Sequence, residues 1–439
     1  MHVIPIRLLL LTLTFIQAAT AEENWPQFRG PGAMGSLTKT NIPDTWNQSE
    51  NIAWKTPVPG MGWSSPVVWG DRVFLTTAIS EGETEKVKEG LYFGGERPKP
   101  NDVHEWRVLC YDLETGKERW NQLVHKGVPS HARHLKNSYA SETAITDGER
   151  VYAYIGNVGL FTFDMDGKKL WEKKWPPVKT RYGWGTAASP YLHGDRLYVI
   201  NDNDEQSFLV ALDKKTGDVV WRRDRDEASN WSPPFVWENS ERTEIVTTGS
   251  KEVRSYSLDG DLLWTLTGLS TITVPSPFAS GDLLYLCSGY VGDRRKPLFA
   301  IRPGARGDIS LGRDETSNEH VAWCQKKAAP YMPTPVLYGD KLYVLLDRGL
   351  ISCYDAKSGD LIYDRERLGK SASFNASPLA FDGKIFCFGE RGETVVIRAG
   401  AEFEELHRNE LGELIMATPA ITRDALVIRT RDHLYCIRR

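Results

Sequence analysis

The sequence predicts an all-β fold, an eight-bladed β-propeller of four-stranded antiparallel blades closed by the N-terminal strand. Three observations predict it. One strand-and-turn signature recurs eight times, large aromatic residues stand at matching places in successive copies, and turn-forming residues separate many short strands. The 15 tryptophans, 38 glycines and 24 prolines are typical of short strands joined by turns, rather than of helices.

The first half of each copy is a strand, a turn and a second strand that begin at a serine or threonine, here called the anchor residue. Examples are "SPYLHGDRLYVIN" at Ser189 and "TPVLYGDKLYVLL" at Thr334. Gly-Asp and Asp-Gly make the turn because these residues tolerate positive φ. Intervals between anchor residues are 41 to 46 residues, apart from two of 78 and 58. The anchor residues are Ser65, Thr143, Ser189, Ser232 (in the weakest copy), Ser276, Thr334, Ser377 and Thr418.

The second half of the copies reads "LCYDLETGKERW" or "LVALDKKTGDVVW": an alternating strand, an Asp-x-x-Thr-Gly turn and a strand with a large aromatic residue. Two hairpins of this length make one four-stranded propeller blade. Burying the closing aromatic residue between neighbouring blades contributes about 2–3 kcal/mol. The expected blade-closing residues are Trp54, Trp120, Trp171, Trp221, Trp264, Trp323 and Tyr363.

Trp54, in "IAWKTP", has no preceding strands of its own, and the chain ends two or three strands into the eighth copy. Trp54 stands 11 residues before the next anchor residue, as Trp221 and Trp323 do. We therefore predict that the N-terminal strand completes the last blade, which removes both open sheet edges.

The two long intervals predict insertions at 80–105 in blade one and 302–319 in blade five. We expect both to be long polar loops inserted within a blade rather than separate domains. Residues 1–21 read as a signal peptide, with Arg7, an apolar run at 8–16 and the small residues Ala19 and Ala21. The apolar run is too short to cross a bilayer. Residues 22–439 are then one propeller domain.

We expect an exported protein, periplasmic or extracellular, that is soluble after signal-peptide removal and acts as a monomer. No transmembrane segment is evident, and no cysteine near the cleavage point supports a lipid anchor. The net charge of -4 gives no indication of a nucleic-acid partner. An even count of six cysteines permits disulfides in an exported protein, whereas four of them occupy strand-like sequences typical of buried small side chains.

The stretches "YDLETGKERW", "ALDKKTGDVVW" and "CYDAKSGDLIY" resemble the repeat of the pyrroloquinoline-quinone (PQQ) propeller superfamily. "NWPQFRGPGAMG" and "KNSYASETAITDGERVYAYIGNVGLF" resemble exported PQQ-like propeller proteins typical of planctomycete bacteria. The resemblance covers almost the whole mature chain. It implies an eight-bladed fold with two kinds of function: quinoprotein alcohol dehydrogenases, and a non-enzymatic branch that includes the outer-membrane assembly scaffold.

Members that bind the quinone stack it between a tryptophan and a vicinal disulfide, beside a calcium ion held by Glu and Asn and a catalytic Asp. This chain has no Cys-Cys pair, and no local motif matches the Asp, Glu and Asn set. We therefore assign no catalytic residue and expect no cofactor. PQQ with calcium remains the alternative.

Candidate binding residues lie in the segments before each innermost strand, which converge at the mouth of the channel. One interpretation is that the aromatic residues form a ring of flat surfaces for a ligand. The other is that they only fill the mouth of the channel and pack under the loops. Two histidines do not complete a zinc site, so we predict no metal site. The candidates are Trp63, Tyr139, Trp184, Trp231, Tyr331 and Phe374, with the polar residues His131, His134, Asn137 and Arg181.

These observations favour a non-catalytic exported propeller that binds an envelope protein or another ligand at the channel face, with 80–105 as a contact element. Two alternatives stay open. One is a PQQ-dependent oxidoreductase of alcohols or sugars, and the other is a carbohydrate-binding propeller that uses the aromatic ring to hold a glycan.

Overall fold

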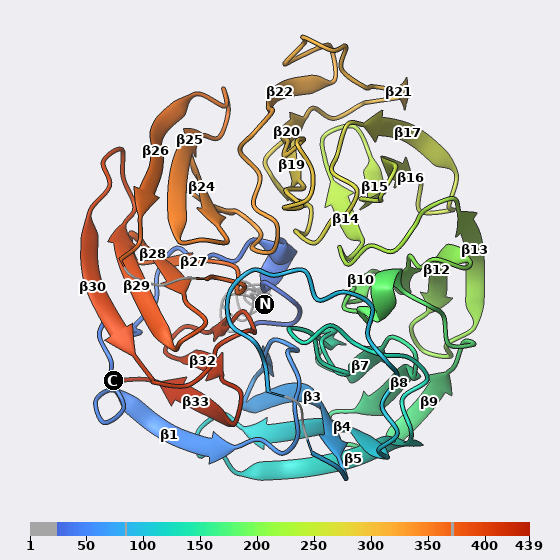
Figure 1. Ribbon diagram of the computed structural model, residues 1–439, viewed down its shortest axis with the longest axis vertical. Helices are drawn as coiled ribbons and strands as arrows, with labels where there is room; N and C mark the ends of the chain where they lie inside the picture. The colour runs from blue at the N-terminus through green and yellow to red at the C-terminus, as the bar shows by residue number, and fades with distance from the viewer. Residues whose placement is uncertain (1–23, 84–85, 370–372) are drawn as a thin grey trace, which may run out of the picture.

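The computed structural model describes residues 24–83, 86–369 and 373–439. In these residues the strands form eight sheets arranged around a central axis (Figure 1). The described helical segments are two single 3-10 turns, η1 (Pro31–Ala33) and η2 (Arg181–Gly183). The predicted all-β, eight-bladed propeller of antiparallel blades is confirmed. The predicted signal peptide, 1–21, lies outside the described residues.

Blades one to four follow the chain from the innermost strand outward, each strand pairing with the next. Blade one holds β2 (Val67–Trp69), β3 (Arg72–Ser80), β4 (His104–Asp112) and β5 (Glu118–Gly127). Blade two holds β6 (Ile145–Thr146), β7 (Arg150–Ile155), β8 (Gly159–Asp164) and β9 (Lys169–Lys173). Blade three holds β10 (Tyr191–His193), β11 (Arg196–Asn201), β12 (Ser207–Asp213) and β13 (Val219–Arg225). Blade four holds β14 (Phe235–Glu238), β15 (Thr243–Thr247), β16 (Glu252–Tyr256) and β17 (Leu262–Thr267).

Blades five to eight repeat this order. Blade five holds β18 (Phe278–Ser280), β19 (Leu283–Cys287), β20 (Leu298–Ile301) and β22 (Val321–Gln325), while β21 (Gly307–Asp308) pairs in parallel with β17 of blade four. Blade six holds β23 (Val336–Tyr338), β24 (Lys341–Leu346), β25 (Leu350–Asp355) and β26 (Leu361–Arg367). Blade seven holds β27 (Leu379–Phe381), β28 (Lys384–Phe388), β29 (Glu393–Arg398) and β30 (Glu405–Glu410). Blade eight holds β31 (Ala420–Ile421), β32 (Leu426–Arg429), β33 (His433–Ile437) and, from the N-terminal end, β1 (Ile52–Pro57).

Blade eight joins the two ends of the described chain. β1 pairs antiparallel with β33, with Trp54 opposite Cys436 and Thr56 opposite Leu434. The N-terminal strand is therefore the outermost strand of the last blade, and the predicted closure is confirmed (Figure 1). Because the ring is closed, each blade has a neighbouring blade on both sides, so the first and last blades leave no sheet face uncovered.

The outermost strands carry tryptophans that bind the turn of the following blade. The indole Nε1 of Trp54 donates a hydrogen bond of 2.8 Å to the carbonyl oxygen of Leu113, and a Cβ on Gly116 would lie 2.6 Å from the indole ring. Gly116 has a φ of 68°, so the turn requires glycine for its backbone as well as for the close approach. The same arrangement joins Trp120 to Gly167, Trp171 to Gly217, Trp221 to Gly260 and Trp323 to Gly359.

Blade four differs because blade five lacks the Asp-x-x-Thr-Gly turn that would receive its tryptophan. The connection 302–320 replaces that turn. Trp264 is fully buried and its Nε1 donates to Glu244 within the same blade, at 2.7 Å. Tyr363 of blade six lies against Phe403, with ring centroids 6.1 Å apart.

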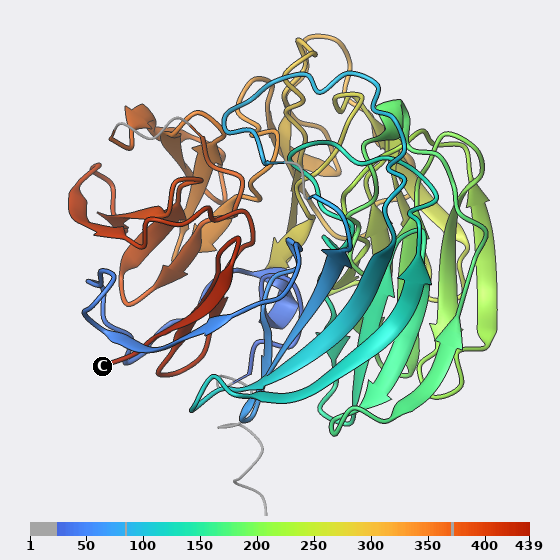
Figure 2. The ribbon, with the colours of Figure 1, turned by 60° about the horizontal axis from the view of Figure 1, so that its bottom comes forward.

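The N-terminal residues 24–37, here called the plug segment, cross the ring on their way to β1 and place η1 in the channel (Figure 2). Trp25 exchanges backbone hydrogen bonds with Val68. The guanidinium of Arg29 is buried and donates to the carbonyl oxygens of Ala33, Thr334 and Pro335. Burial lowers the pKa of Arg29 to about 9. The plug segment thus contacts blades far apart in the sequence.

All six cysteines lie within the described ranges, and each is buried and free. Burial raises the pKa of the Cys110 and Cys436 thiols to about 12, so both stay protonated. No described helix has the length and apolar character needed to cross a membrane.

Gly116→Ala should destabilise the protein more than Gly70→Ala, although both glycines have positive φ. A methyl group at Gly70 meets no atom within 4 Å, so that variant should lose only about 1–2 kcal/mol of backbone strain. The methyl group at Gly116 also overlaps the Trp54 ring, which should cost about 1–3 kcal/mol more. Urea unfolding measures both free energies. Equal losses in the two variants would contradict the blade contact.

Candidate functional site

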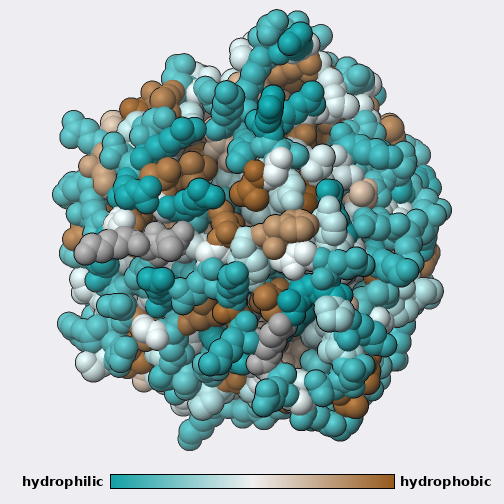
Figure 3. Space-filling view, in the orientation of Figure 1, coloured by the Kyte–Doolittle hydropathy of each residue, from teal (hydrophilic) through white to brown (hydrophobic). Residues whose placement is uncertain are grey.

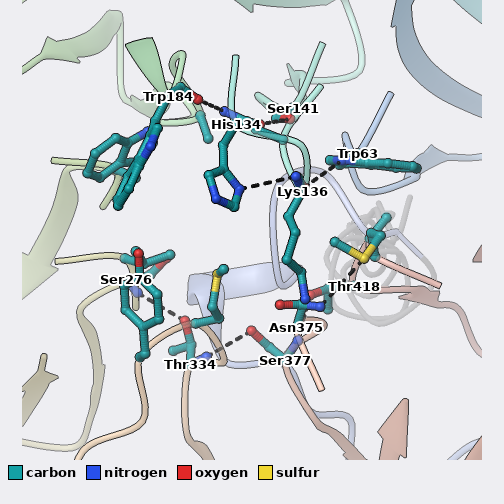
Figure 4. Close-up of a pocket in the computed structure, with 18 of the residues that line it drawn as sticks. Trp63, His134, Lys136, Ser141, Trp184, Ser276, Thr334, Asn375, Ser377 and Thr418 are labelled. Carbon is teal, nitrogen blue, oxygen red and sulfur yellow. Dashed lines mark hydrogen bonds between the residues drawn. The ribbon is translucent and has the colours of Figure 1, made fainter. Parts of the chain in front are cut away.

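A cavity of about 440 Å³ lies at one mouth of the central channel, and we call it the mouth cavity (Figure 4). Most of its walls come from segments that precede the innermost strands, and Phe28 of the plug segment, residues 91–93 of the β3–β4 connection and residues 290–292 of the β19–β20 connection also line it. Large aromatic rings and small hydroxyl residues dominate the lining. The aromatic lining residues are Phe28, Trp63, Tyr92, Phe93, Trp184, Trp231, Tyr290 and Tyr331, and the hydroxyl residues are Ser65, Ser141, Thr143, Ser189, Ser276, Thr334, Ser377 and Thr418.

Six of the ten predicted binding residues line this cavity: Trp63, His134, Asn137, Trp184, Trp231 and Tyr331. His131 and Tyr139 line a separate cavity of about 270 Å³ beside blades one and two. Arg181 does not line the mouth cavity; its guanidinium lies over the ring of Tyr182 at 5.3 Å. Phe374 is fully buried in the apolar core shared by blades six and seven, while the next residue, Asn375, lines the mouth cavity.

The tryptophans of the wall use their polar atoms within the protein. Nε1 of Trp63 donates to the carbonyl oxygen of Lys136 at 3.0 Å, Nε1 of Trp184 donates to Gly95 at 3.1 Å, and Nε1 of Trp231 donates to Gly185 at 2.7 Å. The indoles therefore offer only carbon atoms to the cavity. Trp184 and Trp231 lie beside each other, with centroids 6.1 Å apart.

The connection from β3 to β4, residues 81–103, crosses the mouth, and we call its described residues the strap (Figures 1 and 2). Its Tyr92 ring stacks on His134 at 5.2 Å, and Phe93 meets Trp184 edge to face at 5.7 Å. At the other side the Gly90 amide donates to Glu390, at 2.9 Å. The strap thus spans the opening from blade three to blade seven.

A buried ion pair holds the strap in place. The Lys136 ammonium contacts the Glu390 carboxylate, and both side chains are 2% exposed. Lys136 also donates to the carbonyl oxygen of Gly90 at 2.9 Å, and the Ser373 hydroxyl donates to Glu390 at 2.9 Å. The Asn375 amide group donates to the same carboxylate. Within the described ranges, Lys136 is the single lysine, arginine or carboxylate residue that lines the cavity, and Glu390 neutralises it.

His134 supports the same wall as a neutral imidazole. Its Nδ1 accepts a hydrogen bond of 3.1 Å from the Lys136 backbone amide. Burial, followed by the positive charges of Lys136, Arg97 and Arg133, lowers the pKa of His134 to about 4. A neutral ring with its Nδ1 already occupied is a poor proton donor at neutral pH.

The anchor residues of the repeat form much of the cavity lining, which sequence reasoning missed because it treated them only as markers of the period. In five links the backbone N–H of one anchor residue donates to the hydroxyl of the next blade's anchor residue, each at 2.9 Å. These links run from Ser65 to Thr143, Thr143 to Ser189, Ser276 to Thr334, Thr334 to Ser377 and Ser377 to Thr418. The recurrence of Ser or Thr at one position was the available signal.

The lining does not match PQQ with calcium. PQQ carries three carboxylates, whereas the one ammonium among the described lining residues, that of Lys136, is already neutralised by Glu390. Calcium needs six or more oxygen ligands, and both Glu390 oxygens already accept hydrogen bonds, from Lys136, Ser373 and Gly90. Among the described residues no three His, Cys, Asp or Glu side chains are grouped to hold a metal ion. We therefore derive no reaction through this cofactor.

Comparisons with known proteins agree with this architecture. Residues 156–303 match a PQQ-repeat family model described as outer membrane protein assembly factor BamB. An outer membrane protein assembly factor BamB from Burkholderia pseudomallei is 24% identical over 205 residues, which are 42% of this chain and 50% of that protein. The matched region thus spans about half the length of that curated relative. The resemblance to the PQQ-like propeller superfamily is confirmed.

Solved structures show the same fold at low sequence identity. BamB from Moraxella catarrhalis has a TM-score of 0.52 at 11% identity, covering 82% of this chain and 97% of that one. A quinohemoprotein alcohol dehydrogenase from Comamonas testosteroni has a TM-score of 0.59 at 12% identity, covering 96% and 81%. Because one fold serves an assembly factor and a dehydrogenase, function depends on the residues of the site.

His134 should titrate with a pKa near 4 when its imidazole is followed by NMR. The unfolded chain binds a proton at His134 near its ordinary pKa of 6.5, so this residue makes stability fall as the pH drops from about 6.5 towards 4. His134→Asn should flatten that part of the stability profile. Tyr92→Ala uncovers the ring and should raise its pKa towards 6.5. A parent value already at 6.5 would contradict the burial.

Lys136→Met should destabilise the protein by about 3–5 kcal/mol, because it leaves the buried Glu390 carboxylate without its counter-ion. Adding Glu390→Gln should restore most of that loss. The control is Lys169→Met, which breaks an exposed pair with Glu172 and should cost under about 1 kcal/mol. Chemical unfolding gives the energies, and hydrogen exchange should show faster exchange at 86–95 in Lys136→Met alone. Unchanged strap protection would argue against the ion pair as its anchor.

Proposed function

We propose that this protein is a non-catalytic, exported binding propeller that holds a partner protein of the cell envelope against its mouth face. The observation that carries the proposal is an exposed apolar rim around the opening. Phe93 of the strap is 61% exposed, Val291 of blade five 47% and Tyr182 of η2 39%. Figure 3 shows hydrophobic residues gathered around the centre of this face.

The rim is ordered by its own contacts. The rings of Phe93 and Tyr182 meet edge to face with centroids 5.1 Å apart. The Arg181 guanidinium lies over the Tyr182 ring, 5.3 Å from its centroid. Clustered aromatic side chains that are already held in place lose little entropy when a partner covers them, and such residues dominate binding energy at protein interfaces. Isolated exposed apolar residues need no explanation, but a cluster around a channel mouth supports a binding role.

The similarity to outer membrane assembly factors supports an envelope protein as the partner. The dehydrogenase alternative needs a cavity that can hold an anionic quinone and a metal ion. The neutralised Lys136, and a Glu390 carboxylate whose two oxygens already accept hydrogen bonds, argue against that use. We infer that the protein binds its partner as a monomer.

A photo-crosslinking amino acid at position 182 should give one discrete adduct in intact cells, identified by mass spectrometry. The matched control is the same amino acid at Leu262, which is 56% exposed on the outer strand β17. Phe93→Ser should weaken the adduct at position 182. Identical adducts from positions 182 and 262 would contradict the proposal that the mouth face is the partner-binding surface. Alcohol oxidation by the protein after reconstitution with PQQ and calcium would overturn the non-catalytic role.

A further inference from the structure

We propose that the mouth cavity beneath the strap is a binding site for a short neutral saccharide. Three properties of its lining carry the inference: aromatic carbon surfaces, hydroxyl groups with unused hydrogen-bond donors, and a charge that is already compensated. The proposal concerns the interior of the cavity; of the rim residues, Phe93 and Val291 also line it, whereas Tyr182 does not.

The aromatic walls suit a ligand with apolar faces. Because the indole N–H groups of Trp63, Trp184 and Trp231 bind backbone carbonyls, these residues contribute ring carbons only. Tyr290 and Tyr331 extend the wall at a centroid distance of 5.3 Å. The C–H faces of a pyranose ring are apolar and can lie flat against such surfaces.

The hydroxyls of the anchor residues suit a ligand rich in oxygen. A Ser or Thr hydroxyl has one donor and two acceptor sites. The hydroxyls of Thr143, Ser189, Thr334, Ser377 and Thr418 each accept one backbone N–H, yet none donates to an acceptor within the described ranges. All five residues are at least nine-tenths buried. Each therefore has a proton to offer to an oxygen atom in the cavity.

Two further polar atoms at the cavity lack a protein partner in the described part of the chain. Ser276 is 4% exposed and its Oγ makes no hydrogen bond, and Oδ1 of Asn375 is buried without a donor. A buried polar group without a partner is costly. Asn375 can accept a hydrogen bond and the hydroxyls can donate, so the lining complements a group that both donates and accepts, as a sugar hydroxyl does.

The other ligand classes fit less well. A purely apolar group would leave this set of hydroxyls unpaired. Among the described lining residues an anion would find no free cation, because Glu390 already neutralises Lys136, and a cation would find no carboxylate. The volume of about 440 Å³ lies within the range of small-molecule sites. A neutral molecule with apolar faces and a polar edge satisfies all of these conditions.

Titration calorimetry and tryptophan fluorescence test the site with maltotriose, cellotriose, chitotriose and xylotriose, and with trigalacturonate as an anionic control. At least one neutral trisaccharide should bind saturably at concentrations up to about 10 mM, and trigalacturonate should not. Ser276→Ala should weaken binding about tenfold without lowering the melting temperature, because its Oγ has no bond within the protein to lose. Trp231→Ala should weaken binding by more than tenfold. Ser358→Ala, on the distant turn of blade six, is the matched control and should bind like the parent.

Tyr182→Ser separates the two proposals. This residue does not line the cavity, so the variant should keep its saccharide affinity while it loses the partner adduct formed by a photo-crosslinking amino acid placed at position 291. The saccharide site is overturned if no neutral trisaccharide binds, if trigalacturonate binds equally well, or if binding is the same in Ser276→Ala and the parent. The last result would indicate that ordered water alone pairs with these hydroxyls.

Discussion

The pairing of β1 with β33 is the interaction on which the remainder of the propeller depends. The innermost strands of neighbouring blades contact one another, as β2 contacts β6 and β10 contacts β14, so an open array would leave one exposed sheet face at each end. Completing blade eight with a strand from the other end of the chain converts the array into a ring. The contact of Trp54 with the turn glycine Gly116 of the next blade then recurs at four other junctions of the ring.

Closure also creates the site. The ring brings the anchor residues of successive blades to the same level around the axis, where backbone N–H groups and hydroxyls link one blade to the next. The anchor residues therefore both link neighbouring blades and line the mouth cavity. Because each hydroxyl uses only an acceptor site in these links, the structural contact leaves its donor available for a ligand.

The electrostatics of the mouth cavity also bear on which ligands it can hold. The Lys136–Glu390 pair is buried and neutral, and it fastens the strap through Gly90. The Lys136 charge, which could otherwise attract an anionic cofactor, is thus paired with Glu390 in the contact that holds the strap over the mouth. Since one fold hosts catalysts and scaffolds, such details of the lining carry the functional argument.

The sequence by itself determined the number of blades, their strand order and the closure by Trp54, because each depends on a local pattern that recurs with one period. Only the tertiary structure decided which residues meet at the mouth. Side chains alternate in direction along an extended chain, so Asn375 lines the cavity while its neighbour Phe374 lies in the core. Lys136 and Glu390 are 254 residues apart and carry no shared motif. Their contact exists because the closed ring and the strap bring distant loops together.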